Sequence, residues 1–192
     1  MIAAPAKIIR RLTRGIAISV ALGFAGTSSF AQADIYSNDT LITGLEYGLI
    51  CNVKTVGSEP APDTDRGSIG LIESTGFSTH STIVPAQLGL SFGVKSNAIE
   101  GDAIQGVRIS VTHPPYKDSG TTDESWVSTI YTDGASTQMF TFDFPAELLI
   151  GKWTLSAQKD DQILYRVTFD VVSPANAPAY LRNLCEGDAL TS

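Results

Sequence analysis

The sequence predicts an all-β protein: an immunoglobulin-like antiparallel β-sandwich with a short C-terminal tail that a disulfide clips to the domain. Apolar and polar residues alternate along several segments, which is typical of half-buried antiparallel strands. Clusters of Gly, Pro, Asp and Ser separate these segments at intervals of about 8–12 residues, as they do in sandwiches. Helical periodicity is nearly absent.

The alternating segments can be followed in order along the chain. Residues 34–39 are expected to be a polar lead-in, and the first strand covers 45–53. Further strands are expected at 68–74, 77–84, 88–94, 107–111, 126–131 and 140–144. In the last of these, the phenylalanines at 140, 142 and 144 are expected to form an aromatic inner face.

The clearest pair of strands lies near the C-terminus. Residues 153–159 and 163–171 alternate on both sides of an Asp-Asp-Gln turn, which predicts a β-hairpin. Residues 145–149 predict one helical turn at a corner. The sandwich domain is therefore assigned to residues 34–173 and the tail to 174–192, with apolar anchors that pack back on the sandwich.

Residues 1–33 have the pattern of a cleavable signal peptide. Four basic residues precede an apolar stretch at 15–26, and Ala31-Gln32-Ala33 supplies the small residues of a cleavage site. A periplasmic or secreted protein beginning near Asp34 is expected. The pair Arg10-Arg11 leaves both Sec and twin-arginine export open. No later apolar run approaches about 18 residues, so no transmembrane segment is expected in the mature chain.

The charge balance excludes one class of partner. The four leader charges are all basic, so nine of the 13 Lys and Arg remain against all 20 Asp and Glu. Such a surface repels nucleic acid, because nucleic acid is a polyanion. The acidity either keeps an exported protein soluble or steers a basic partner, and the sequence leaves both open.

Cys51 and Cys185 are the chain's two cysteines. In an oxidising compartment a disulfide between them is the expected state. The alternative is a reactive thiol, which would leave the other cysteine unpaired.

The segment 89–93 matches the G-x-S-x-G motif of serine hydrolases, with Ser91 as the nucleophile. Asp102 and His113 follow in the order of a triad. That motif needs a strand, a sharp turn and a helix, and no helix is expected here. We therefore expect Gly89, Ser91 and Gly93 to share the outer face of a strand, where small residues mark a bulge or close contact with another backbone. A hydrolase acting through Ser91 stays an alternative.

His113 lies at the inward end of its strand, before Pro114-Pro115. Its imidazole either hydrogen-bonds to backbone or forms one wall of a site with the loop 116–126. The candidate contact residues are His113, Tyr116, Asp118, Asp123, Glu124 and Trp126. The carboxylates of this loop are hard oxygen ligands, but their spacing matches no known calcium loop, so a solvated turn is the simpler interpretation. A second candidate contact loop is 60–65.

No phosphate-binding glycine loop or cofactor motif is present, so no cofactor and no metal is predicted. Several motifs resemble the bacterial domain-of-unknown-function family numbered 3859: Tyr47-Gly48-Leu49-Ile50-Cys51, Pro60-Ala61-Pro62-Asp63-Thr64, Thr112-His113-Pro114-Pro115, Trp126 and Gly151-Lys152-Trp153. The resemblance covers about residues 44–173. It implies an exported all-β bacterial protein and brings no activity or catalytic residue with it.

These observations favour an exported, non-enzymatic binding module for a protein partner or small ligand. The alternatives are a hydrolase, either through Ser91 or metal-assisted through His113, and an inhibitor or chaperone that offers an extended edge to another exported protein. The identity of the ligand or partner is not encoded in any motif.

Overall fold

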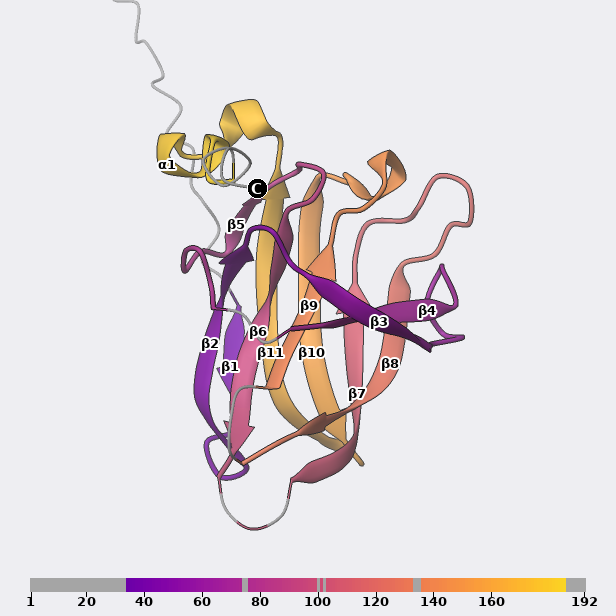
Figure 1. The fold of residues 1–192 in the computed structure, drawn as a ribbon, viewed down its shortest axis with the longest axis vertical. Helices are drawn as coiled ribbons and strands as arrows, with labels where there is room; N and C mark the ends of the chain where they lie inside the picture. The colour runs from indigo at the N-terminus through magenta and orange to yellow at the C-terminus, as the bar shows by residue number, and fades with distance from the viewer. Residues whose placement is uncertain (1–33, 74–75, 100, 102, 133–135, 186–192) are drawn as a thin grey trace, which may run out of the picture. The chain divides into compact units, whose positions relative to one another are not determined.

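The computed structural model describes residues 34–73, 76–99, 101, 103–132 and 136–185 (Figure 1). The expected signal peptide and the last residues of the tail lie outside this part. The strands are β1 (Ile35–Ser37), β2 (Ile42–Ile50), β3 (Thr55–Pro60), β4 (Ser68–Ile72), β5 (Ile83–Pro85), β6 (Ser91–Ala98), β7 (Ile104–Thr112), β8 (Asp123–Ile130), β9 (Ser136–Thr141), β10 (Gly151–Lys159) and β11 (Gln162–Val172). Two 3-10 turns, η1 (Pro145–Glu147) and η2 (Pro174–Asn176), and the short helix α1 (Ala179–Arg182) complete the described elements.

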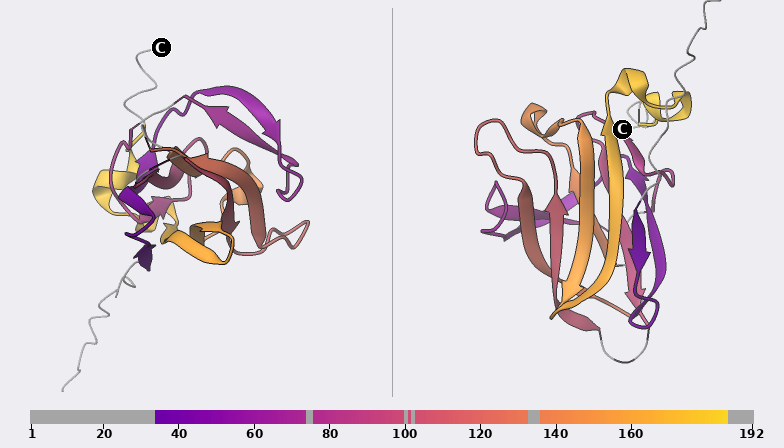
Figure 2. Two further views of the ribbon diagram at one scale, coloured as in Figure 1. Left: turned by 90° about the horizontal axis from the view of Figure 1, so that it is seen from below. Right: turned by 180° about the vertical axis from the view of Figure 1, so that it is seen from behind.

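The strands form two main layers (Figure 2). One sheet has the order β1-β11-β10-β7-β8, with β5 added to β11 as a parallel neighbour. The other has the order β2-β6-β9, and β3 and β4 pair only with each other. Apart from β5, all of these pairs are antiparallel. The predicted fold class, an immunoglobulin-like antiparallel sandwich, is confirmed.

The core is an aromatic cluster between the two sheets. Trp153 on β10 is fully buried, and its ring meets Phe92 and Phe142 edge to face at 5.9 and 5.6 Å. Its indole N–H donates to the carbonyl of Leu149 at 2.9 Å, so the one polar atom of the ring is satisfied. Edge-to-face contacts place the positive rim of one ring against the negative face of the next, which stabilises this packing beyond the area that it buries.

The predicted alternation is confirmed most clearly on the sheet that contains β7, β10 and β11. Val107, Ile109 and Val111 are fully buried, and so are Trp153, Leu155 and Ala157. β10 and β11 form the expected hairpin, with one register shift after Ala157. That bulge explains why both Leu164 and Tyr165 are buried, although strict alternation would place them on opposite faces.

Three expectations about the strands were wrong. The expected strand 77–84 is a strand only from Ile83, where β5 begins. Residues 35–37 are not part of a polar lead-in, because they form β1 and pair with β11. Main-chain hydrogen bonds hold this edge strand, and they need no apolar pattern in the sequence. The aromatic inner face ends at Phe142, since Phe144 lies beyond β9 and is 54 % exposed. The strand ends at Thr141, so the alternation cannot carry Phe144 into the core.

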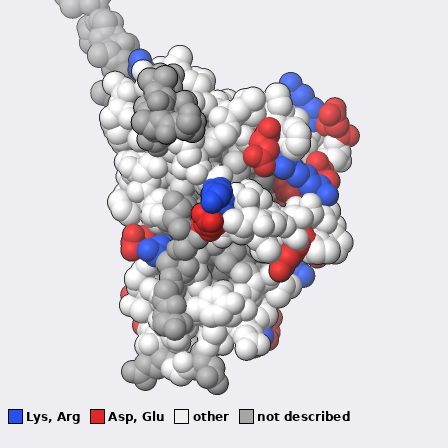
Figure 3. Space-filling view, in the orientation of Figure 1, with Lys and Arg blue, Asp and Glu red and all other residues white. Residues whose placement is uncertain are grey.

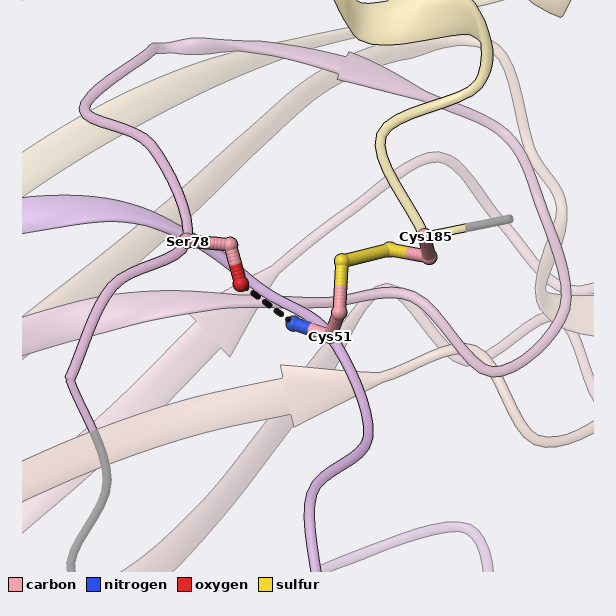
Figure 4. The surroundings of a disulfide bond; sticks show 3 residues. All are labelled: Cys51, Ser78 and Cys185. Carbon is pink, nitrogen blue, oxygen red and sulfur yellow. Dashed lines mark hydrogen bonds between the residues drawn. A yellow bond between two sulfur atoms is a disulfide. The ribbon is translucent and has the colours of Figure 1, made fainter. Parts of the chain in front are cut away.

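The C-terminal tail packs back on the domain. Leu181 of α1 is buried in the core, and the Cys51–Cys185 disulfide joins the end of β2 to the tail, with 5.4 Å between the Cα atoms. The N–H of Cys51 donates to the hydroxyl of Ser78 at 3.0 Å (Figure 4). The disulfide of antibody domains crosses between the two sheets. Here it clips the tail to one end of the sandwich instead.

We expect the double substitution Cys51→Ser and Cys185→Ser to lower the free energy of unfolding by about 2–5 kcal/mol, because the bridge closes a long loop and restricts the unfolded chain. The bridged residues are 134 positions apart. Urea unfolding measures the change. The wild type in reductant should match the variant, and equal stability of oxidised wild type and variant would contradict the expectation.

Candidate functional site

The sandwich is open along one side. β8 is the outer strand of one sheet and β9 the outer strand of the other, and the two do not pair although they follow each other in the chain. Side chains bridge them instead. The indole N–H of Trp126 donates to Gln138 Oε1 at 3.1 Å, and Gln138 Nε2 donates to Ser128 Oγ at 2.8 Å. The two sheets are thus held together here without closing into a barrel.

The hairpin of β3 and β4 covers this opening and crosses the direction of β8 and β9 (Figure 1). Beneath it lies a groove of about 850 Å³, which we call the hairpin groove. This volume is in the range of natural ligand sites. Its roof and walls include Ile69, Leu71 and Ile72 of the hairpin, Trp126, Val127, Ser128 and Thr129 of β8, and Thr137, Gln138, Met139, Phe140 and Thr141 of β9.

The hairpin is attached to the sandwich at both of its ends. At its base, the chain continues from Cys51, which carries the disulfide. Lys54 and Glu73, at the two sides of the base, form an exposed ion pair with each other at 3.1 Å. At its tip, the loop 61–67 binds the sandwich through two groups of contacts. Between these ends every residue of β3 is exposed. The hairpin therefore depends on its ends for its position, because no residue of β3 is buried against the sandwich.

The first tip contact is centred on the carboxylate of Glu124, on β8. Its Oε2 accepts the N–H of Asp65 at 2.9 Å, and its Oε1 accepts the hydroxyl of Tyr116 at 2.9 Å. Next to it, the N–H of Ser125 donates to the carbonyl of Asp63 at 3.0 Å. Glu124 is only 6 % exposed, so these hydrogen bonds act in a poorly solvated environment, where they are strong.

His113 lies directly behind this carboxylate. Its ring stacks on Trp153 at 4.7 Å and lies 4.2 Å from the ring of Tyr116. Nδ1 donates to the carbonyl of Pro114 at 2.8 Å, because a carbonyl oxygen can only accept. Nε2 is 3.4 Å from Glu124 Oε1, which is too long for a strong hydrogen bond, but the two groups form an ion pair when the imidazole is protonated.

These surroundings change the acidity of two groups. Burial opposes the charged form of Glu124, but His113, the Asp65 N–H and the Tyr116 hydroxyl together hold the pKa of the carboxyl below its ordinary value of 4.5. Burial raises the pKa of Tyr116, and the neighbouring carboxylate raises it further. Glu124 is therefore a charged acceptor and Tyr116 a neutral donor at neutral pH.

The second tip contact is made by Arg66. Its guanidinium pairs with Asp143 at 2.9 Å and with Glu147, and it lies 4.1 Å above the centre of the Phe144 ring. The other oxygen of Glu147 accepts the N–H groups of Asp143 and Phe144 at 2.7 and 2.9 Å. Glu147 thus both fixes the turn η1 and holds the hairpin tip, and the cation explains why Phe144 remains at the surface.

The structure brings the two predicted contact loops together. Residues 60–65 form the tip of the hairpin, and they dock onto 116–126 through Asp63 and Asp65. His113, Tyr116 and Glu124 are buried beneath that contact, whereas Asp118 is exposed and Trp126 is half-buried in the hairpin groove. Their role in binding stays a prediction.

Asp123 has a local role. Its two oxygens accept the hydroxyls of Thr112 and Thr122, both at 2.7 Å. These hydrogen bonds lower the pKa of the Asp123 carboxyl. They fix the start of β8, on which Glu124 is the next residue.

Sequence reasoning missed Arg66, Glu147 and Gln138. Arg66 lies in a turn with no flanking pattern, and its partners are 77 and 81 residues away in the chain. For Glu147 the sequence does contain one local signal. This residue follows a Pro at the start of a single helical turn, and a carboxylate in the first turn often caps exposed N–H groups.

Ser91 does not have the surroundings of a catalytic serine in the described part of the chain. It is fully buried, and its hydroxyl is 2.8 Å from that of Thr141. A side chain at Gly93 would collide with the Gln138 carbonyl, so close backbone contact is confirmed there, whereas a side chain at Gly89 would meet nothing within 4 Å. The expected outer-face position of Ser91 was wrong, because Ser91 is fully buried. Asp102 lies outside the described residues.

Within residues 34–185, gaps excepted, no three His, Cys, Asp or Glu side chains come together as a metal site. The helices described in that range are all too short or too polar to cross a membrane.

The domain of unknown function DUF3859 matches residues 39–171. The chain belongs to this family. The resemblance of the sequence motifs is thereby confirmed, and most of the hairpin, the hairpin groove and Glu124 lie within the DUF3859 domain. No curated protein sequence matches the chain. Among solved structures, an immunoglobulin-like protein from Pseudomonas aeruginosa is 21 % identical and has a TM-score of 0.48, over 74 % of this chain and 100 % of that one.

We expect Glu124→Gln to lower the free energy of unfolding at neutral pH by about 1–3 kcal/mol, because an amide is a weaker acceptor for buried donors. The lowered pKa means that the carboxylate stabilises the fold above pH 4.5 and that this contribution is lost as the pH falls toward the folded pKa. Urea unfolding at neutral pH and at about pH 3 should show the difference shrinking. A constant difference would contradict the assignment, and Asp118→Asn is the exposed control.

We expect Arg66→Ala to loosen the hairpin more than it destabilises the domain. Hydrogen exchange of the β3 and β4 amides should rise about tenfold, since the tip would lose its ion pairs, and global stability should fall by about 1 kcal/mol or less. Lys54→Ala is the matched control, because Lys54 is 72 % exposed in its ion pair with Glu73. Equal exchange in the two variants would contradict a tip anchor.

Proposed function

We propose that this DUF3859 domain is an exported, non-enzymatic interaction module that binds a protein partner in the hairpin groove. The groove is the observation that carries the proposal. It combines half-buried apolar side chains, among them Trp126, Met139 and Phe140, with many polar groups, and that mixture is typical of recognition sites.

The hairpin supports a binding function over a purely structural one. A hairpin that only completed the core would bury one face, yet all of β3 is exposed, and Val56 is 58 % exposed. Its ends are nevertheless tied by the Cys51–Cys185 disulfide and by Arg66. A hairpin that is fixed at both ends but buries little of its own surface is better explained as part of a binding site than as part of the core.

Export is the second part of the proposal. The basic and apolar pattern of residues 1–33 supports a cleavable signal peptide, and a long-range disulfide is consistent with an oxidising compartment. We propose the periplasm or the extracellular space as the place of function.

Site-specific photo-crosslinking tests the binding site. With benzoylphenylalanine at Val127, which lines the groove and is 69 % exposed, ultraviolet light should yield one discrete protein adduct in the exported fraction of producing cells. The same probe at Tyr36 on β1, the opposite edge of that sheet, is the control and should yield none. Absence of any adduct at Val127, or identical adducts from both positions, would contradict binding in the groove.

A further inference from the structure

We infer that the hairpin groove receives an extended, positively charged segment of the partner, which adds to the open edges of β8 and β9 as an extra β-strand. The inference rests on the proposed function and names the chemistry of the partner. Two observations carry it: the direction of the free main-chain groups and the charge of the groove.

The main chain of β9 offers hydrogen bonds toward the groove. The N–H of Phe142 donates to the Leu90 carbonyl at 3.1 Å, so the main chain of Phe142 faces β6. In an antiparallel pair this direction alternates along the strand. In the constant register of β6 and β9, the main-chain groups of Thr137, Met139 and Thr141 therefore face outward. All three of these residues line the groove.

The edge of β8 has the same property. The N–H of His113 donates to the Thr122 carbonyl at 2.8 Å, so by alternation Ser125, Val127 and Thr129 direct their main-chain groups away from β7. The hairpin tip already uses the first of these, since the N–H of Ser125 donates to Asp63. Val127 and Thr129 continue the same edge into the groove. A partner strand would extend an interaction that the domain already makes with its own chain.

Apolar side chains lie beside this edge. Met139 and Phe140 flank the groove on either face of β9, so alternate side chains of an added strand would meet apolar surface.

The negative charge of the groove favours a partner segment that is positively charged. Five carboxylates line it, those of Glu59, Asp65, Glu124, Asp143 and Glu147, against the single guanidinium of Arg66. Arg66 is already paired with two of them. Figure 3 shows charged side chains of both signs gathered over the hairpin and the neighbouring loops, with a largely uncharged surface elsewhere on that face. Glu124 is buried and already hydrogen-bonded, so Glu59 and Asp65 are the carboxylates that lysines or arginines in the partner would meet.

Charge also disfavours a second copy of this chain as the occupant. The chain has a formal net charge of −7, so two copies repel. An extended basic segment would hydrogen-bond to the free main-chain groups of β8 and β9, and its cations would pair with the carboxylates.

The test uses a random dodecapeptide library displayed on phage and selected on the mature, disulfide-bonded protein. Selected peptides should be rich in Lys and Arg, should alternate them with β-branched or aromatic residues, and should lack internal Pro. For one selected peptide, the Kd measured by fluorescence anisotropy should rise at least tenfold in high salt. Binding should slow hydrogen exchange at Thr137, Met139, Thr141, Val127 and Thr129.

The variant Met139→Pro removes one outward N–H and leaves the ladder to β6 intact, because that N–H does not face β6. It should raise the Kd at least tenfold. Met139→Ala is the matched control, since it removes the side chain and keeps the N–H, and it should change the Kd less than about threefold by comparison. Thermal unfolding of both variants shows whether each keeps the fold. If Met139→Pro does not fold, Thr137→Pro, on the same edge of β9, takes its place in the test.

Neutral, acidic or Pro-rich selected peptides would overturn the inference, and so would failure to select any. Equal affinity of the wild type and the proline variant would also overturn it. The photo-crosslinking at Val127 separates this failure from failure of the proposed function. A discrete adduct without selectable basic peptides would leave an interaction module whose partner binds in another way.

Discussion

The carboxylate of Glu124 is the interaction on which the arrangement of the site depends. It accepts hydrogen bonds from the N–H of Asp65 in the hairpin tip and from the hydroxyl of Tyr116 in the loop after β7. The imidazole of His113, at the end of β7, lies next to it. A buried charge is costly unless it is compensated from several sides. Here the hairpin tip and the loop after β7 supply the hydrogen bonds, and His113 lies 3.4 Å away. The need to satisfy one carboxylate therefore fixes the relative positions of segments that are distant in the chain.

The core supports that carboxylate from below. His113 lies between Tyr116 and Trp153, and Trp153 is at the centre of the aromatic cluster that joins the two sheets. The polar site and the apolar core thus share a stack of rings. Arg66 adds a second connection at the solvent side, where it joins the hairpin to η1. Because the two connections belong to adjacent residues of one loop, the tip has a defined place although every residue of β3 is exposed.

Much of the sandwich could be predicted from the sequence, and the reasons differ between its parts. β7, β10 and β11 have one buried face each, so their alternation reports burial directly. β3 has no buried residue, and β1 is held by main-chain pairing, so neither has a side-chain pattern to detect. The disulfide followed from the number of cysteines and the expected compartment. The loops of the candidate site were recognised by composition, but their contact depends on pairs such as Asp65 and Glu124, which are 59 residues apart.

The attachment of the hairpin at both ends has a topological consequence. It makes the hairpin a bridge over β8 and β9, and the passage beneath a bridge runs along the strands that the bridge crosses. A bound chain can enter the groove along its length, end first. Alternatively, the hairpin tip dissociates from Glu124 and from the partners of Arg66, and it rebinds after the chain has entered. The first route requires a segment with a free end, whereas the second also allows an internal loop. The rate of tip opening would then set how fast a loop enters and how long it stays.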